Sequence, residues 1–193
     1  MGERCIVFEM KKAVFFDRDG VLNESIICDG ISCPPRDADA LVVCSDAYAA
    51  LPLLRRSGHL LICVTNQPDV ARGTRTMDNV AEMNEKVRRD LDLDALFCCP
   101  HDTRDGCSCR KPEPGMLLEA AKCFGIDLAL SWMIGDRASD ILAGKRAGCH
   151  TIFLDKGPGG NHTCPDEADY TAANLIEASQ YILSRHLSHK ERA

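Results

Sequence analysis

The sequence predicts an α/β fold in which helices flank a central parallel sheet, without a large cap domain. Short apolar runs alternate with segments of helical periodicity along the chain, which is typical of βαβ units. Three of these runs lead into residues with reactive side chains, as strands do at the carboxyl edge of such a sheet. The length of 193 residues suits one well-filled core, so we expect residues 1–193 to form a single domain.

Strands and helices are expected in alternation along the whole chain. The expected strands are the apolar runs at residues 13–16, 60–64, 95–98, 132–134 and 151–154. The expected helices show a three-to-four spacing of apolar residues or stop at a glycine, and they span residues 45–56, 76–91, 115–124, 138–147 and 175–187. Ser45 is the expected N-cap of the first helix.

Three segments have no regular periodicity. Residues 18–41 contain glycines and a pair of prolines, and we expect turns or a small flap there. Residues 156–165 are rich in glycine and proline and are expected to be a loop, and residues 188–193 a frayed polar tail. Because we find no insertion large enough for a cap domain, we expect only loops to cover a site.

Charge and hydropathy argue against two classes of protein. The formal net charge is −6, whereas nucleic-acid binding depends on clustered lysine and arginine. No run approaches the ~20 apolar residues of a membrane span. The first ten residues lack the apolar core and cleavage site of a secretory signal. We therefore expect a cytoplasmic protein, a monomer, whose partner is a small molecule and not a nucleic acid or a membrane.

Four of the twelve cysteines lie in apolar runs. A cysteine in such a run behaves as a small buried hydrophobe, and an intracellular chain keeps its thiols reduced. We therefore expect buried free thiols at Cys44, Cys63, Cys123 and Cys149.

A second group of cysteines has the spacing of a structural zinc site. Two i, i+2 pairs, CPH at residues 99–101 and CSC at 107–109, are separated by five residues. Such clips close tetrahedrally around Zn²⁺, and four protein ligands leave no position for water. Cys98 is a further candidate, but at a strand end it faces the opposite way from its neighbour. The predicted zinc ligands, which would pin a loop at residues 98–112, are Cys99, His101, Cys107 and Cys109.

Two carboxylates follow the first expected strand, at Asp17 and Asp19, and Gly20 allows a tight turn after them. One carboxylate can attack phosphorus to form an acyl phosphate, while the other donates and accepts the proton. An isolated pair of this kind can equally be a solvated loop end. The spacing of aspartate and glycine does not match a Ca²⁺ loop.

The fourth expected strand leads into Asp136 and the sequence RASD. Asp136 can join Asp17 as a ligand of Mg²⁺, which prefers oxygen and takes one or two carboxylates. Its alternative role is the N-cap of the helix that follows. Asp140 is either a support for the site or a residue of the helix surface.

Two further residues can hold a phosphoryl group. Thr65, at the end of an apolar run, can donate its hydroxyl hydrogen, and Lys111 can supply a positive charge. Taken singly, each signal is weak, because threonine ends many strands and a loop lysine is usually solvated.

The chain resembles the haloacid dehalogenase (HAD) superfamily over nearly its whole length. The motifs that carry the resemblance are DRDG, the strand-end threonine, the lysine before a proline, and GDRASD. The resemblance implies a Rossmann-like HAD fold and a Mg²⁺-dependent phosphatase. It implies that Asp17 is the nucleophile and Asp19 the general acid and base, with Thr65 and Lys111 on the phosphate. Its magnesium ligands would be Asp17, Asp136 and the backbone carbonyl of Asp19.

The zinc loop, which continues as RKPEPGM, is similar to that of the histidinol-phosphatase and D,D-heptose 1,7-bisphosphate phosphatase branch. Two motifs favour the heptose enzymes: TNQ followed by ARG, and KPEPGM. The five-residue spacing between the two zinc-ligand pairs and the sequence GDRASDI also match the histidinol group. Pro68-Asp69 departs from the small pair expected after Gln67, and residues 25–28 diverge as well. By position, the resemblance implies these substrate contacts: Ser25, Ile26, Ile27, Cys28, Thr65, Asn66, Gln67, Pro68, Arg110, Lys111 and Arg137.

Three functions follow as hypotheses. The first is removal of the C7 phosphate of D-glycero-D-manno-heptose 1,7-bisphosphate to leave heptose 1-phosphate, and the second is hydrolysis of histidinol phosphate. The third is a zinc-stabilised binding module with an inactive site. The third hypothesis is disfavoured because the expected catalytic residues are all present: Asp17, Asp19, Lys111 and Asp136.

Overall fold

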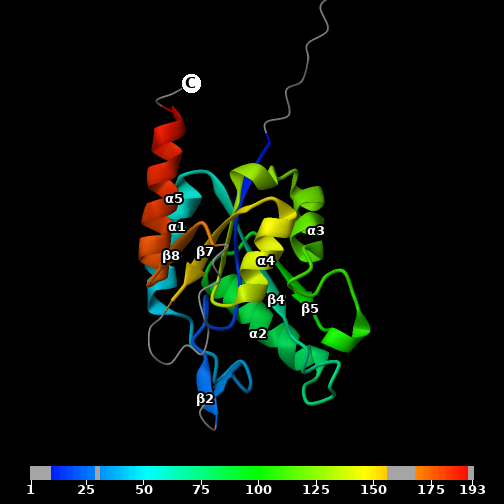
Figure 1. The fold of residues 1–193 in the computed structure, drawn as a ribbon. Helices are drawn as coiled ribbons and strands as arrows, with labels where there is room; N and C mark the ends of the chain where they lie inside the picture. The colour runs from blue at the N-terminus through cyan, green and yellow to red at the C-terminus, as the bar shows by residue number, and fades with distance from the viewer. Residues whose placement is uncertain (1–9, 29–30, 156–167, 191–193) are drawn as a thin grey trace, which may run out of the picture.

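A computed structural model describes residues 10–28, 31–155 and 168–190. Six parallel strands form the main sheet in the order β5-β4-β1-β6-β7-β8 (Figure 1). The chain adds strands first to one side of β1 and then to the other, so the strand order reverses its direction at the centre of the sheet. This confirms the predicted parallel α/β fold. The strands are β1 Lys12–Phe16, β4 His59–Asn66, β5 Ala95–Cys99, β6 Trp132–Gly135, β7 His150–Leu154 and β8 Tyr170–Ala172.

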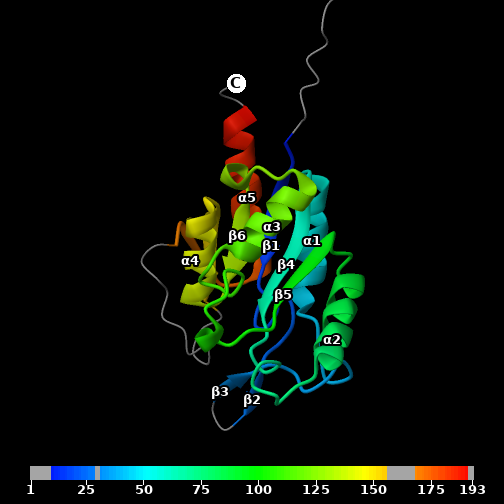
Figure 2. The same ribbon diagram turned by 90° about the vertical axis from the view of Figure 1, so that its right-hand side faces the viewer.

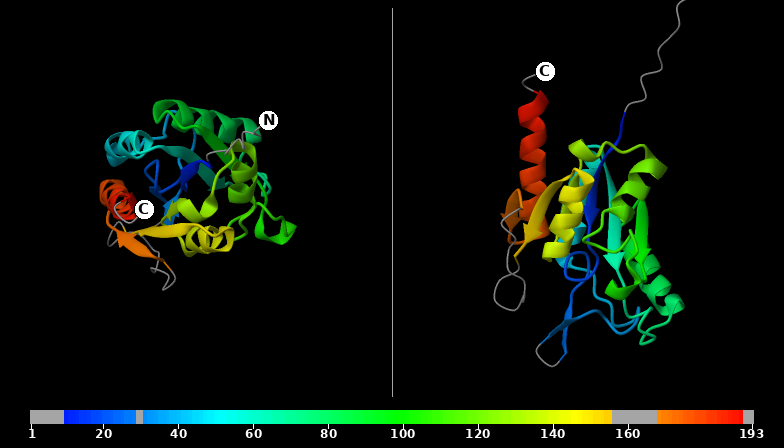
Figure 3. Two further views of the ribbon diagram at one scale, coloured as in Figure 1. Left: turned by 90° about the horizontal axis from the view of Figure 1, so that it is seen from above. Right: turned by 45° about the vertical axis from the view of Figure 1, so that its right-hand side comes forward.

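Helices cover both faces of the sheet. The first layer consists of α1 (Ser45–Arg56), α2 (Met77–Asp90) and α5 (Leu175–Lys190), and the second of α3 (Gly115–Phe124) and α4 (Ala138–Ala147). The view from above in Figure 3 shows the sheet between these layers. Two short 3₁₀ helices, η1 and η2, span Thr103–Asp105 and Leu128–Leu130.

Strand β1 shows why this sequence forms the centre of the sheet. Four of its five residues are completely buried, as expected of a strand covered on both faces. Val14 and Phe16 pack under the first helix layer, and Ala13 and Phe15 under the second. The alternation of side chains along a strand therefore splits one apolar run between two cores.

A two-stranded antiparallel hairpin, β2 (Ile26–Cys28) and β3 (Ile31–Cys33), lies within the segment predicted to be a flap. It projects beyond the carboxyl edge of the main sheet (Figure 2). Within the described ranges, no inserted domain accompanies it. Nor does any described helix combine the length and apolar character needed to cross a bilayer.

The structure corrects several local expectations. Strand β8 was not expected, because three residues with one exposed side chain are too short to show a period. Cys44 and not Ser45 is the N-cap of α1. Helix α5 continues to Lys190, three residues past the expected end, and the glycine-rich segment 156–165 lies outside the described residues.

The cysteine expectations hold with one exception. Cys44, Cys63 and Cys149 are buried free thiols as predicted, whereas Cys123 is exposed. Cys123 lies on the solvent side of α3, because the helix buries only one stripe of its surface.

Candidate active site

The site lies at the carboxyl edge of the three central strands. Asp17 follows β1 directly, Asp136 follows β6, and Thr65 is the penultimate residue of β4. Because β1 pairs with both β4 and β6 in parallel, these strand ends are neighbours in space. The backbone N–H of Asp17 donates to the carbonyl of Ile134 at 3.0 Å, which fixes the start of the loop after β1.

Three carboxylates meet at this edge. One oxygen from each of Asp17, Asp136 and Asp140 lies within 4.8 Å of the others. Asp140, whose role the sequence left open, is buried in the first turn of α4. One of its oxygens accepts the backbone N–H of Arg137 at 3.1 Å, so it caps the helix and faces the cluster at once.

The Lys111 side chain is buried inside the cluster. Its ammonium group lies 2.6 Å from Asp17 Oδ1 and 2.7 Å from Asp140 Oδ1, and it donates to the Val64 carbonyl at 2.7 Å. An ammonium group has three hydrogens to donate, and these partners use all of them. The Asn66 side chain holds the backbone of Lys111 through two hydrogen bonds, of 2.9 and 3.0 Å.

Burial sets the protonation of these groups. Burial raises the pKa of Asp17 to about 6, against the opposing effect of the Lys111 charge. Burial, and next the negative charge of Asp17, raises the pKa of Asp136 to about 7. Burial by itself lowers the pKa of Lys111, but the charges of Asp140 and Asp17 outweigh it and hold that pKa above its usual range. Lys111 is therefore a permanent cation.

The cluster has the features of a divalent-cation site. Three carboxylates face one ammonium group, so negative charge is left over, and Oδ1 of Asp136 is buried without a hydrogen-bond partner among the described residues. Gly20 has a φ of +86°, and a Cβ atom there would lie 2.3 Å from Asp136 Oδ2. The turn after Asp19 thus requires glycine both for its backbone angle and for the approach of Asp136.

Asp19 lies apart from this cluster in a set of hydrogen-bond donors of its own. It accepts from Arg18, from Asn23 Nδ2 at 3.1 Å and from Gln67 Nε2 at 2.8 Å. The same Gln67 amide donates to Thr65 Oγ1 at 3.0 Å. A hydroxyl that accepts one hydrogen bond still has a proton to donate.

A cavity of about 860 Å³ opens above the carboxylates. Asp17, Asp19 and Asp140 line it, whereas Thr65 is 1% exposed and is absent from the lining. Ile26 is exposed but not part of the lining, and the side chains of residues 27 and 28 lie outside the described part. The implied substrate residues that do line the cavity are Ser25, Asn66, Gln67, Pro68, Arg110, Lys111 and Arg137.

Sequence reasoning missed other residues of the lining. Asp69, Arg72, Asp102 and Thr103 come from the loop after β4 and from the loop after β5. Arg72 joins the two loops through an ion pair with Asp102 at 2.5 Å. The sequence contained one signal for these residues: at Asp69 it departs from the expected motif and places an additional charge next to the site.

The four predicted zinc ligands converge beside the cavity. Cys109 Sγ lies 3.2 Å from Cys99 Sγ, 3.4 Å from Cys107 Sγ and 3.4 Å from His101 Nδ1. Cys99 Sγ lies 3.6 Å from both Cys107 Sγ and His101 Nδ1. Cys98 packs in the other core cluster, on the opposite side of the sheet from Cys99. The set of four can therefore hold a metal ion without Cys98.

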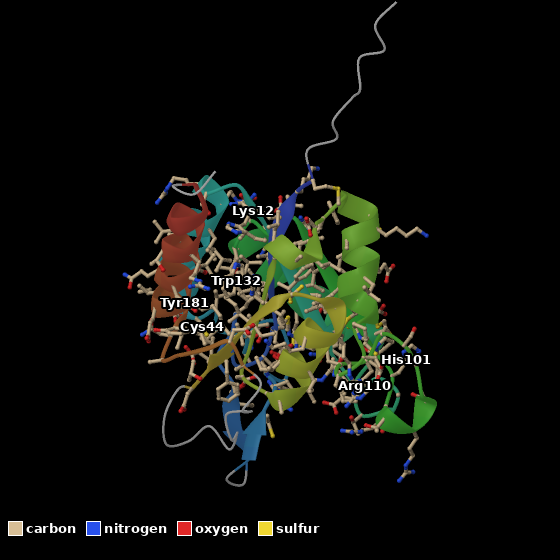
Figure 4. The ribbon with its side chains drawn as sticks, turned by 45° about the horizontal axis from the view of Figure 1, so that its top comes forward. Lys12, Cys44, His101, Arg110, Trp132 and Tyr181 are labelled. Carbon is tan, nitrogen blue, oxygen red and sulfur yellow. The ribbon has the colours of Figure 1, made fainter. Side chains whose placement is uncertain are left out.

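Arg110 extends from this loop toward the cavity. Its guanidinium donates to the His101 carbonyl at 3.1 Å, and Figure 4 shows the two residues together at one side of the molecule. This hydrogen bond joins a cationic side chain of the cavity lining to a residue of the four-ligand cluster.

Comparison with known families agrees with this geometry. A family model described as HAD-hydrolase-like matches residues 108–178, which include Lys111, Asp136 and Asp140. The solved structure of the D,D-heptose 1,7-bisphosphate phosphatase from B. bronchiseptica, complexed with magnesium and phosphate, matches with a TM-score of 0.76 at 28% identity, covering 90% of this chain and 99% of that one. Fold and site together define a HAD-like hydrolase.

Curated relatives show which family of HAD-like hydrolases the chain belongs to. The D-glycero-β-D-manno-heptose-1,7-bisphosphate 7-phosphatase of Pasteurella multocida is 36% identical over 90% of this chain and 97% of its own length. The protein of the same name from Escherichia coli K12 is 32% identical over 88% and 93%. The chain belongs to this family of heptose bisphosphate phosphatases.

The raised pKa values predict how stability depends on pH after metal is removed. Because the folded protein binds the proton of Asp136 more tightly than the unfolded chain does, folding becomes less favourable as pH rises from about 4 through about 7. Denaturant unfolding of chelator-treated protein should show the wild type losing on the order of 3 kcal/mol relative to Asp136→Asn between pH 4 and 8. Parallel stability curves for the two proteins would contradict this assignment.

Proposed function

We propose that this protein is a Mg²⁺-dependent phosphatase that removes the C7 phosphate of D-glycero-β-D-manno-heptose 1,7-bisphosphate and leaves heptose 1-phosphate. The observation that carries the proposal is a buried aspartate, paired with Lys111, that lines a cavity in a chain 36% identical to an enzyme of that name. The relatives' shared name includes the β configuration, and on that basis we assign the β anomer.

The chemistry proceeds in two steps. A carboxylate oxygen of Asp17 attacks phosphorus, so an acyl-phosphate bond forms as the bond from phosphorus to the C7 oxygen breaks. Asp19 donates a proton to the departing oxygen and then accepts one from the water that hydrolyses the acyl phosphate. Lys111 stabilises the charge on the transferring group. Both aspartates line the cavity, as these roles require.

Asp17, Asp136 and the backbone carbonyl of Asp19 would hold the magnesium ion. The unpartnered Oδ1 of Asp136 and the surplus negative charge fit a hard divalent cation that takes oxygen ligands. When bound, the ion offsets the repulsion between an anionic nucleophile and an anionic substrate.

The second metal in the proposal is a structural Zn²⁺ on Cys99, His101, Cys107 and Cys109. A tetrahedral site with Zn–S bonds of about 2.3 Å places its ligands about 3.8 Å apart. The spacings of 3.2 to 3.6 Å between the ligand atoms are close to this value.

Two arginines of the cavity lining favour a second anionic group over the amine of histidinol phosphate. The lining acids Asp102 and Glu113 are paired with Arg72 and Arg146. Arg110 and Arg137 line the same cavity, and neither forms an ion pair within the described segments. Two guanidinium groups without a close carboxylate partner among the described residues suit the 1-phosphate of a sugar bisphosphate.

Replacing the nucleophile tests the reaction. Asp17→Asn should lower phosphate release by more than about 1,000-fold, because the amide cannot form the acyl phosphate. Asp78→Asn in α2, an exposed aspartate that is not part of the cavity lining, serves as the matched control. Phosphate release, circular dichroism and metal content should be measured together. Full activity of the Asp17 variant would reject its role.

A substrate screen tests the specificity. We expect the largest kcat/KM for the β anomer of the heptose bisphosphate, above the α anomer, histidinol phosphate and glucose 6-phosphate. Arg110→Met should raise KM for the bisphosphate about 10- to 100-fold, the range for hydrogen bonds to charged groups, and leave p-nitrophenyl phosphate nearly unaffected. A preference for histidinol phosphate would reject the substrate and leave the chemistry intact.

Metal analysis tests the zinc. Protein purified without chelator should contain about one zinc per chain. Cys107→Ser should lose it together with thermal stability, whereas Cys123→Ser, at an exposed thiol of α3, should keep both. A wild-type protein that is free of zinc yet equally stable would refute the assignment.

A further inference from the structure

Arg18 is a buried cation that the proposed reaction does not use. Its side chain is 0% exposed, and it is absent from the cavity lining although Asp19 next to it lines the cavity. Burial of a guanidinium group is unfavourable unless its hydrogens are paired. The pairing of Arg18 therefore shows what this charge stabilises.

The guanidinium contacts two side chains. Nε and Nη2 donate to Asp19 Oδ1 at 3.2 and 3.0 Å, and Nη2 also donates to Asp19 Oδ2 at 2.9 Å. Nη1 donates to Asn84 Oδ1 at 2.7 Å. A planar fork that contacts both carboxylate oxygens fixes the orientation of the group as well as its position.

Asn84, which is not part of the cavity lining, holds the guanidinium. It lies on the buried face of α2, 66 residues along the chain, and is 8% exposed. Its side chain also interacts with Cys98 of β5, the cysteine left over from the metal cluster. Arg18 is thus held by a residue of α2 that itself contacts β5.

The turn after β1 does not explain the guanidinium group. The backbone carbonyl of Arg18 accepts the N–H groups of Val21, Leu22 and Asn23, so the turn depends on the main chain. The buried neighbours in the same turn, Val21 and Leu22, are apolar and do not require a cation. Contact with Asp19 is what distinguishes arginine at this position.

We propose that Arg18, held by Asn84, is a positioning residue that keeps the Asp19 carboxyl group oriented for proton transfer to the leaving oxygen. This inference rests on the proposed phosphatase function. Nη2 contacts both carboxyl oxygens, so whichever oxygen is protonated, the other still accepts a hydrogen bond from Arg18. Neither Arg18 nor Asn84 lines the cavity.

The test compares two leaving groups. A sugar alkoxide needs the proton from Asp19 to depart, whereas p-nitrophenolate departs without it. The ratio kcat/KM reports all steps up to and including the departure of the leaving group. Arg18→Met should lower kcat/KM for the heptose bisphosphate about 100-fold, the low end of a general acid's contribution, and that for p-nitrophenyl phosphate less than about threefold. Asn84→Leu should give a smaller loss with the same selectivity.

Val80→Ala, on the same buried face of α2, is the control for lost packing and should show no selectivity. Equal losses with both substrates, or no loss, would overturn the inference; if Arg18→Met fails to fold, Asn84→Leu decides by the same criterion. If the wild type prefers histidinol phosphate, that compound replaces the heptose bisphosphate as the alkoxide-leaving substrate in this comparison. A wild type inactive on every phosphate overturns the proposed function, and active protein with uniform losses overturns only this inference.

Discussion

The Lys111 ammonium group pairs with Asp17 and Asp140 and donates to the Val64 carbonyl. Its partners follow β1, begin α4 and lie in β4, so one side chain joins three elements at the carboxyl edge of the sheet. The contacts are buried, and loss of the cation would leave two carboxylates uncompensated, at a cost of about 3–5 kcal/mol. The arrangement of the site depends on this charge.

The position of Lys111 depends in turn on the loop that carries it. Cys109 of the four-ligand cluster lies two residues earlier in the chain, and Asn66 at the end of β4 bonds to the Lys111 backbone. A loop of this kind has little core of its own, since η1 contains no buried residue. A metal ion on the cluster would hold such a loop where hydrophobic packing cannot.

Two aspartates separated by one residue have different environments. Asp17 is paired with Lys111 from the loop after β5, and Asp19 with Arg18 from the same turn. Each carboxylate thus has its own cation, and of the two cations Lys111 lines the cavity whereas Arg18 does not. This separation lets neighbouring carboxylates serve as nucleophile and as proton donor in the proposed reaction.

The sequence by itself determined the parallel α/β fold and the strand ends that carry Asp17, Thr65 and Asp136, because side-chain period and strand length are local properties. Only the tertiary structure showed the buried place of Asp140, the pairing of Arg18 with Asn84, and the short edge strand β8. Residues 18 and 84 are far apart in the chain, and nothing in either segment records the other. Such contacts arise when the sheet and helices pack, and their energies depend on burial, which a linear pattern does not contain.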